Sequence, residues 1–387
     1  MGANKCRHIQ SHSSIAEGSL MSPIIEIILI GCLVATTAAI PGCFLILRKM
    51  AMMSDAISHS VLLGIVLMFF AIKTLHSPLL IIAATITGLV TVVFTEALIS
   101  SKKMKKDAAI GFIFPLFFAL AIILITQYAG NIHLDQDAVI LGEIAFAPFN
   151  RMIWGGIDYG PIAMWVMGLI GFINALFIGC FYKELKIATF DPALASSLGL
   201  APSRLHYGLM ACVSITCVGA FDSVGTILIV ALIITPPATA YLLTRKLSTM
   251  ILLSIMIGCL CSILGTILAL SIDGSIAGAM CTVAGALFLL AFLFSPNHGI
   301  IHKFYNQKQQ KIQFSAILLT IQFINHQGQD SFEFSMENLI EHMRWSEPFA
   351  QKIMSYALAK NYIKRNKKAY ELTPYGIEVA KNAMASS

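Results

Sequence analysis

Charged residues are scarce in this chain, and their scarcity excludes most soluble folds. They make up 12% of 387 residues, whereas a soluble domain carries roughly 25%. Apolar residues make up 57% of the sequence, which is more than a soluble core of this size takes up. The composition therefore predicts a membrane protein.

Catalytic signatures are missing as well. The sequence contains no HExxH, GxSxG or Walker A (GxxxxGK[ST]) motif, so it shows no zincin, serine-hydrolase or nucleotide-hydrolysing site. Nine cysteines are present without a CxxC pair, and eight of them lie in apolar runs, where cysteine behaves as a small hydrophobe. We expect a protein that is not an enzyme and has no permanently bound cofactor.

Long apolar runs dominate what is present. A helix needs about 20 mostly apolar residues to cross a bilayer. The predicted spans are 24–47, 57–72, 78–99, 109–128, 161–182, 205–221, 224–243, 250–271 and 276–294. The mixed stretch 129–160 is predicted as an outer loop with short helices. The predicted fold class is an all-α polytopic membrane protein with eight or nine transmembrane helices and a small C-terminal domain.

Basic residues indicate the orientation of these spans. With nine spans, 11 of the 15 Lys and Arg residues before position 300 fall on one side. The positive-inside rule makes that side cytoplasmic. The amino terminus is then predicted outside and the carboxyl terminus inside.

Charges near the spans are the next signal, because such residues are costly and usually functional. Asp55 and His59 are four residues apart and therefore lie on one helix face. A carboxylate and an imidazole form a partial ligand shell for manganese, zinc or iron(II). An alternative remains open: Ser54 and Asp55 favour a helix start, and a backbone carbonyl then satisfies His59.

The chain changes character after Pro296. We divide it into a polar segment 1–20, a membrane domain 21–300, a linker 301–311 and a cytoplasmic domain 312–387. Apolar residues recur with helical spacing in 314–325 and 349–358. Residues 362–372 alternate around a basic turn, as a β-hairpin does, and Thr373-Pro374 opens a last helix.

This order of elements is that of a winged helix. The tail resembles the DNA-binding part of metal-dependent repressors of the diphtheria-toxin-repressor type over roughly 75 residues. DNA binding and a regulatory or docking role both remain open. The predicted nucleic-acid contacts are Lys352, Lys364, Arg365, Lys367 and Lys368.

Ordered blocks across 21–300 carry a second resemblance. The segment 47–64, which contains Asp55 and His59, resembles the hallmark of the zinc/manganese/iron ABC transporter permeases, the ABC-3 family. Four further blocks match in the expected order. They are 106–111, then 190–192 with 198–200, then 224–240, and last 293–296.

The resemblance implies a permease subunit that imports a divalent transition metal across the inner membrane. It implies three kinds of partner: ABC ATPase subunits, an extracytoplasmic metal-binding protein and a second permease subunit. DNA remains a possible partner of the C-terminal tail. Asp55 and His59 would bind the transported manganese, zinc or iron transiently, with Glu143 and Asp222 as weaker candidates. The segment that couples transport to the ATPase would contain Phe190, Asp191, Pro192 and Gly199.

Two residues depart from the family pattern. Ala193 follows Asp-Pro where an acid is usual, and Asp222 stands where the family is usually uncharged. The alternative function is a membrane-tethered, metal-responsive DNA-binding regulator whose permease part no longer transports.

Overall fold

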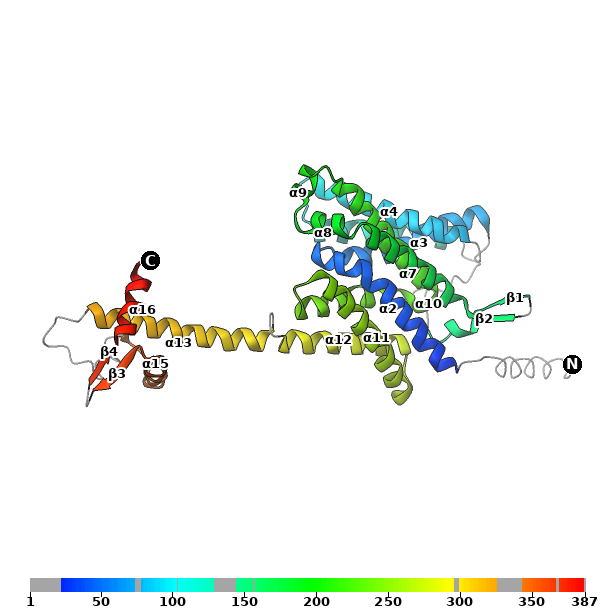
Figure 1. Cartoon of the computed structure of the whole chain (residues 1–387). Coiled ribbons are helices and arrows are strands. Elements are labelled where there is room, and N and C mark those ends of the chain that lie inside the picture. The colour runs from blue at the N-terminus through cyan, green and yellow to red at the C-terminus, as the bar shows by residue number, and fades with distance from the viewer. Residues whose placement is uncertain are drawn as a thin grey trace. The chain divides into compact units, whose positions relative to one another are not determined.

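The computed structural model describes residues 22–73, 78–102, 104–128, 144–155, 157–295, 299–325, 343–366 and 369–385. The chain divides into two compact units, Met1–Asn297 and His298–Ser387, and each is described by itself. Figure 1 shows the first unit as a bundle of long helices and the second as a smaller group of helices with a hairpin.

Eight helices in the described part of the first unit are long and apolar enough to cross a membrane. They are α2 (Pro23–Leu47), α3 (Met52–Ile72), α4 (Pro78–Ser100), α5 (Lys106–Tyr128), α7 (Ile162–Cys180), α10 (Pro202–Leu243), α11 (Leu247–Ile272) and α12 (Ile276–Phe294). Large apolar side chains such as Phe112, Leu169 and Leu252 are exposed on their outer faces. Lipid is the environment in which such surfaces are stable, so the first unit is a multi-pass membrane protein.

Most predicted spans agree with these helices at both ends. Six of them match a helix to within three residues, and only α3 and α10 differ more. The predicted span 57–72 starts too late, because α3 begins at Met52. Asp55 and His59 had shortened the apolar run, but their side chains meet at 3.4 Å and are accommodated inside the helix.

The helix α10 contains two of the predicted spans. Its 42 residues would extend about 63 Å as one straight helix, roughly twice the hydrocarbon thickness of a bilayer. Gly225 interrupts it with φ 74° and ψ 170°. The predicted spans 205–221 and 224–243 lie on either side of this glycine.

Packing shows that α10 doubles back at Gly225. Leu209 lies near the start of α10, and Leu247 lies four residues beyond its end. Both pack in one cluster with Phe44, near the carboxyl end of α2. The two ends of α10 therefore lie at the same end of the bundle, and its midpoint lies at the other (Figure 1).

Prolines inside α2, α5 and α10 leave backbone carbonyls without their helical partner. Pro41 in α2 frees the carbonyl of Thr37, and Nδ2 of Asn174 on α7 donates to that oxygen at 3.4 Å. The same amide donates to Oγ1 of Thr216 on α10 at 2.7 Å. A side chain from a neighbouring helix thus satisfies the freed group, as a membrane interior requires.

Pro237 in α10 frees the carbonyl of Ile233 in the same way. That oxygen faces Gly42 of α2, where an added Cβ would lie 2.2 Å from it. Only a residue without a side chain fits this close approach, so α2 and α10 pack with their backbones almost in contact.

The two ends of the bundle carry different short elements (Figure 1). One end holds α8 (Tyr182–Phe190) and α9 (Pro192–Ser197); the other holds the 3-10 turn η1 (Ala147–Phe149) and the antiparallel strands β1 (Arg151–Trp154) and β2 (Ile157–Pro161). The prediction of short helices in 129–160 was therefore largely wrong for the described residues. Arg151 on β1 pairs with Asp158 on β2, which favours a hairpin. Residues 129–143 lie outside the described residues.

The second unit contains α13 (Ile300–Asn325), α15 (Glu347–Ala359), β3 (Ile363–Asn366), β4 (Ala369–Leu372) and α16 (Pro374–Ala385). The two strands pair as an antiparallel hairpin. Leu319, Phe323, Ile353, Met354 and Tyr362 share one buried cluster. The predicted helices and hairpin are confirmed, and the segment predicted as a linker, 301–311, lies inside α13.

Candidate functional site

The predicted Asp55–His59 pair lies in the first two turns of α3. Nε2 of His59 is 3.4 Å from Oδ1 of Asp55. The helix begins after Ala51, which has no capping side chain, and Ser54 Oγ donates to the Ala51 carbonyl. Asp55 is therefore not an N-cap, although it lies in the first turn of α3, and its carboxylate faces the histidine.

The pair is partly open and has an aromatic boundary. The side chains of His59 and Asp55 are 33% and 37% exposed. The imidazole packs against Phe114 and Phe118 of α5, at ring-centroid distances of 5.8 and 5.9 Å. Two ligands with apolar neighbours and one open side can accept an ion and release it again.

The weaker metal candidates are not brought to this pair. Asp222 is exposed in α10, three residues before the reversal at Gly225. Glu143 lies outside the described residues. Within the described ranges, no group of three or more His, Cys, Asp or Glu side chains is placed to hold a metal ion. The geometry thus offers a two-ligand site rather than a closed cage.

The predicted coupling segment forms the short helix α9 with both ends capped. Asp191 is its N-cap and accepts from the backbone N–H of Leu194 at 2.9 Å, and Pro192 occupies the first turn. Asp at the N-cap followed by Pro in the first turn is a common way for a helix to start. Beyond the cap, the roles of these residues stay predictions.

Gly199 closes the other end of α9. Its φ is +78°, and its N–H donates to the Ser196 carbonyl while that of Leu200 donates to Ala195. This is a Schellman motif, in which a left-handed residue satisfies the last carbonyls of a helix. Large apolar side chains are exposed along this segment, namely Phe190 at the end of α8, Leu194 on α9 and Leu198 just after α9.

A polar cluster that the sequence analysis missed joins α8 to three spanning helices. Arg48, directly after α2, donates from Nε to Oγ1 of Thr189 on α8 at 3.1 Å. A second guanidinium nitrogen lies 3.0 Å from Nδ1 of His206 on α10. Nε2 of His206 lies 2.5 Å from Oε1 of Glu96 on α4, a close polar contact without the alignment of a good hydrogen bond.

The protonation of this cluster follows from its donors. Arginine can only donate, so Nδ1 of His206 is an acceptor, and the ring proton of the neutral imidazole is on Nε2, facing Glu96. Burial lowers the pKa of Arg48, and the nearby charge of Glu96 opposes that shift. No motif marked these residues, which are up to 158 positions apart in the sequence.

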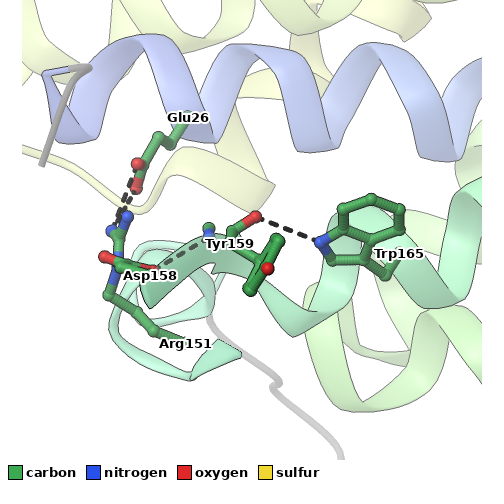
Figure 2. A network of polar contacts seen from close by, with 6 residues as sticks. Glu26, Arg151, Asp158, Tyr159 and Trp165 are labelled. Atoms are coloured by element: carbon green, nitrogen blue, oxygen red, sulfur yellow. Dashed lines mark hydrogen bonds and ion pairs between the residues drawn. The ribbon is translucent and has the colours of Figure 1, made fainter. Parts of the chain in front are cut away.

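At the opposite end of the bundle a second ion-pair network holds the hairpin to α2 (Figure 2). Arg151 donates to both carboxylate oxygens of the buried Glu26 at 3.1 Å and, from Nε, to Asp158 at 2.5 Å. Trp165 of α7 donates to the carbonyl of Tyr159 at 3.1 Å. The hairpin is therefore fixed to the start of α2 and to α7.

Charge and hydrogen bonding shift two pKa values in this network. The backbone N–H of Gly160 and, after it, Arg151 hold the pKa of Asp158 below its usual range, although desolvation opposes this. For Arg151, desolvation lowers the pKa, but the bonds to Asp158 and Glu26 outweigh it and the net pKa is raised. The ion pairs therefore persist at neutral pH.

The predicted nucleic-acid contacts lie in the second unit. Lys352 is exposed on α15 and Arg365 on β3, and Lys364 pairs with Glu371 at 3.1 Å. Lys367 and Lys368 lie outside the described residues. Part of the predicted basic face is thus neutralised within the hairpin.

Comparisons with known proteins agree with the arrangement of the first unit. Residues 21–295 match a family described as the ABC 3 transport family. A chain in the solved structure of PsaBC from Streptococcus pneumoniae in complex with Fab has the same fold, with a TM-score of 0.61 and 30% identity. That match covers 78% of this chain and 99% of the other.

The alignments with two relatives cover different lengths of this chain. The zinc transport system membrane protein TroD of Treponema pallidum is 44% identical over 357 residues, which cover 92% of this chain and 97% of TroD. The manganese transport system membrane protein MntD of Bacillus subtilis is 45% identical over 277 residues, which cover 72% of this chain and 94% of MntD. The first alignment is longer than the 297-residue first unit and must reach into the second, whereas the other is shorter.

Proposed function

Because this chain belongs to the ABC 3 transport family, we propose that it is the permease subunit of a transporter that imports a divalent transition metal across the cytoplasmic membrane. The observation that carries the proposal is the Asp55–His59 pair on a spanning helix. Ionisable side chains inside spanning helices are costly and are usually kept for a substrate path. Each ion would bind to the two side chains and leave through their open side.

The metal belongs to the group that carboxylate and imidazole ligands accept. Zinc, manganese and iron(II) all do so, and selectivity among them depends on geometry and supply. Two of the relatives carry zinc and manganese in their names. We therefore propose zinc, manganese or iron as the transported ion.

ATP hydrolysis would come from separate subunits, since the sequence contains no Walker A motif. We propose that they dock at α9, where Leu194, Leu198 and the preceding Phe190 of α8 are exposed. Exposed apolar side chains on a rigid short helix are suited to an interface with another protein. A second permease subunit would complete the path, and an extracytoplasmic metal-binding protein would deliver the ion at the hairpin end.

The reversal in α10 supports an orientation. Eight spanning-length helices in the described residues, one of which doubles back, would give nine crossings, with the two ends of the membrane unit on opposite sides. The end with α8 and α9 carries most basic loop residues, which supports a cytoplasmic position. The amino terminus is then outside and the second unit cytoplasmic.

For the second unit we propose a winged-helix-like regulatory or docking module. Two helices and a hairpin with a shared core, followed by α16, support this arrangement. The Lys364–Glu371 pair reduces the positive charge that DNA would require. DNA binding therefore stays a prediction from the sequence.

Metal uptake into vesicles that contain the complete complex tests the function. Asp55→Asn and His59→Ala should each reduce uptake by at least about tenfold, because each removes one of two ligands. Asp273→Asn is the matched control, since Asp273 is an exposed acid at the end of α11. Normal uptake in both site variants would refute the site, and absence of uptake by the wild-type complex would refute the function.

A further inference from the structure

Two cysteines on different spanning helices face each other in the membrane unit. The Sγ of Cys32 on α2 lies 3.8 Å from the carbonyl oxygen of Cys259 on α11, and the Sγ of Cys259 lies 3.9 Å from the carbonyl oxygen of Cys32. The two thiols also contact each other directly. Thr36, one turn after Cys32, lies 3.9 Å from the same Cys259 sulfur. The Cys259 side chain therefore lies between two turns of α2.

The two helices approach closely on both sides of this pair. A Cβ built on Gly31 would lie 3.1 Å from the Cβ of Ser262. A Cβ built on Gly258 would lie 2.9 Å from the Cβ of Ala35. Disulfide bridges need Cβ atoms about 3.5–4.5 Å apart. The two cysteines lie between these contacts in both sequences, where the backbones are close enough for a bridge.

The pair is partly open and lies inside the membrane. Cys32 and Cys259 are half-buried. Cys32 is nine residues from the start of α2, which corresponds to about 13.5 Å along the helix and lies within the hydrocarbon. Among the other described cysteines, four are buried, namely Cys43, Cys212, Cys217 and Cys261. An oxidant that dissolves in lipid therefore reaches the half-buried pair more readily than these four.

We propose that Cys32 and Cys259 form a redox modification site, at which a quinone dissolved in the membrane oxidises the two thiols to a disulfide. Two S–H bonds break and one S–S bond forms. The two protons and two electrons pass to the quinone, which becomes a quinol. The product is a covalent bridge between α2 and α11.

The bridge would fix the seam between these two helices and slow transport. Passage of an ion requires packed helices to shift against one another. Because α2 also packs almost backbone to backbone on α10 at Gly42, a link at Cys32 would restrain α2 between two neighbours. This consequence rests on the proposed function, whereas formation of the bridge does not.

Peptide mass spectrometry of the complex in lipid vesicles tests the bridge. A fully ring-substituted short-chain benzoquinone, which cannot add to thiols, should produce a linked peptide that contains Cys32 and Cys259. Cys32→Ser should give no linked peptide at Cys259. Cys261→Ser with Cys281→Ser, on α11 and α12, is the matched control and should form the bridge as the wild type does. No bridge in the wild type, or a bridge from Cys259 to another cysteine, overturns the proposal.

Metal uptake by the same vesicles tests the consequence. Oxidation should lower uptake by the wild type at least about fivefold, and dithiothreitol should restore it. Cys259→Ser should keep the uptake that it had before oxidation. A bridge with undiminished uptake overturns the effect on transport. A wild-type complex that forms the bridge but takes up no metal even before oxidation supports the modification site and refutes the proposed function.

Discussion

At the scale of single residues, the membrane unit satisfies polar groups through neighbouring helices. Asn174 on α7 bonds to the Thr37 carbonyl that Pro41 has freed and to Thr216 on α10. Arg48 joins α2, α8 and α10 in the same manner. In each case one long polar side chain ties together segments that are distant in the sequence.

The left-handed residue after α9 gives one residue-scale prediction. Gly199→Ala should destabilise the end of α9 by about 1 kcal/mol, because φ of +78° is unfavourable for a residue with a Cβ. Nothing lies within 4 Å of the added Cβ, so backbone strain is the sole cost. Amide hydrogen exchange measures this change, and we expect faster exchange in residues 194–200 of the variant.

Gly199→Asn provides the matched control, since asparagine tolerates the left-handed conformation better than alanine. Its exchange rates should lie between those of wild type and Gly199→Ala. Equal rates in all three proteins would show that the Schellman geometry does not stabilise the coupling segment.

Asp158 gives a prediction on pH. Its folded pKa is lowered, so its contribution to stability is full above the unfolded pKa of about 3.9 and is lost as pH falls through the lower folded value. At pH 7 the wild-type protein should have a higher melting temperature than Asp158→Asn, by an amount equivalent to about 1 kcal/mol or less. The difference should shrink as the pH falls below the unfolded pKa and disappear below the lower folded pKa.

Melting in detergent between pH 7 and pH 3 measures this difference. A gap that widens on acidification would have the wrong sign for a carboxylate with a lowered pKa. Such a result would contradict a stabilising role of Asp158 in the network that holds the hairpin to Glu26.

At the scale of elements, Gly225 determines the path of α10. Its φ and ψ of 74° and 170° lie in a region that glycine alone occupies readily. Gly225→Ala should cost about 1–3 kcal/mol and lower the yield of folded protein. Gly285→Ala is the control, because Gly285 lies in α12 with no atom within 4 Å of an added Cβ.

Size-exclusion chromatography and melting of the two variants check this prediction. Gly285→Ala should match wild type or be slightly more stable. If Gly225→Ala is equally well folded, another residue of α10 absorbs the reversal.

The elements also show which parts were predictable from sequence. Apolar runs located the spans, because lipid selects for length and hydropathy along the chain itself. Helical spacing located the Asp55–His59 pair, because both residues share one helix. Neither signal reports contacts between helices, so the cluster of Arg48, His206 and Glu96 went unpredicted.

The hairpin at 151–161 shows the same limit. Its mixed sequence gave no strong alternation, and its stability comes from Arg151, which bonds to Asp158 across the turn and to Glu26 over 100 residues earlier. The start of α3 was misplaced for a related reason. Two polar residues that satisfy each other do not end a helix, although they interrupt its apolar run.

At the scale of the whole molecule, the two units have separate cores and different distributions among relatives. MntD is covered over 94% of its length by an alignment shorter than the first unit. Deletion of 298–387 should therefore leave a folded membrane unit that still transports. Uptake by the shortened chain in the reconstituted complex, compared with the full chain, is the measurement.

Two outcomes distinguish the roles of the second unit. If the shortened chain reaches the same maximal uptake but responds differently to metal concentration, the second unit has a regulatory role. Complete loss of uptake in a chain that remains folded and complexed would contradict a separable second unit.

Pro41 and Pro237 have a consequence for movement. Bending a helix normally stretches backbone hydrogen bonds on its outer side, but at each proline one of these bonds is already absent. Pro237 lies against Gly42, the residue after Pro41, so the two weakened points lie at the same level of α2 and α10. The two helices thus lack a backbone hydrogen bond at the same level, and bending there would stretch fewer of these bonds than bending elsewhere.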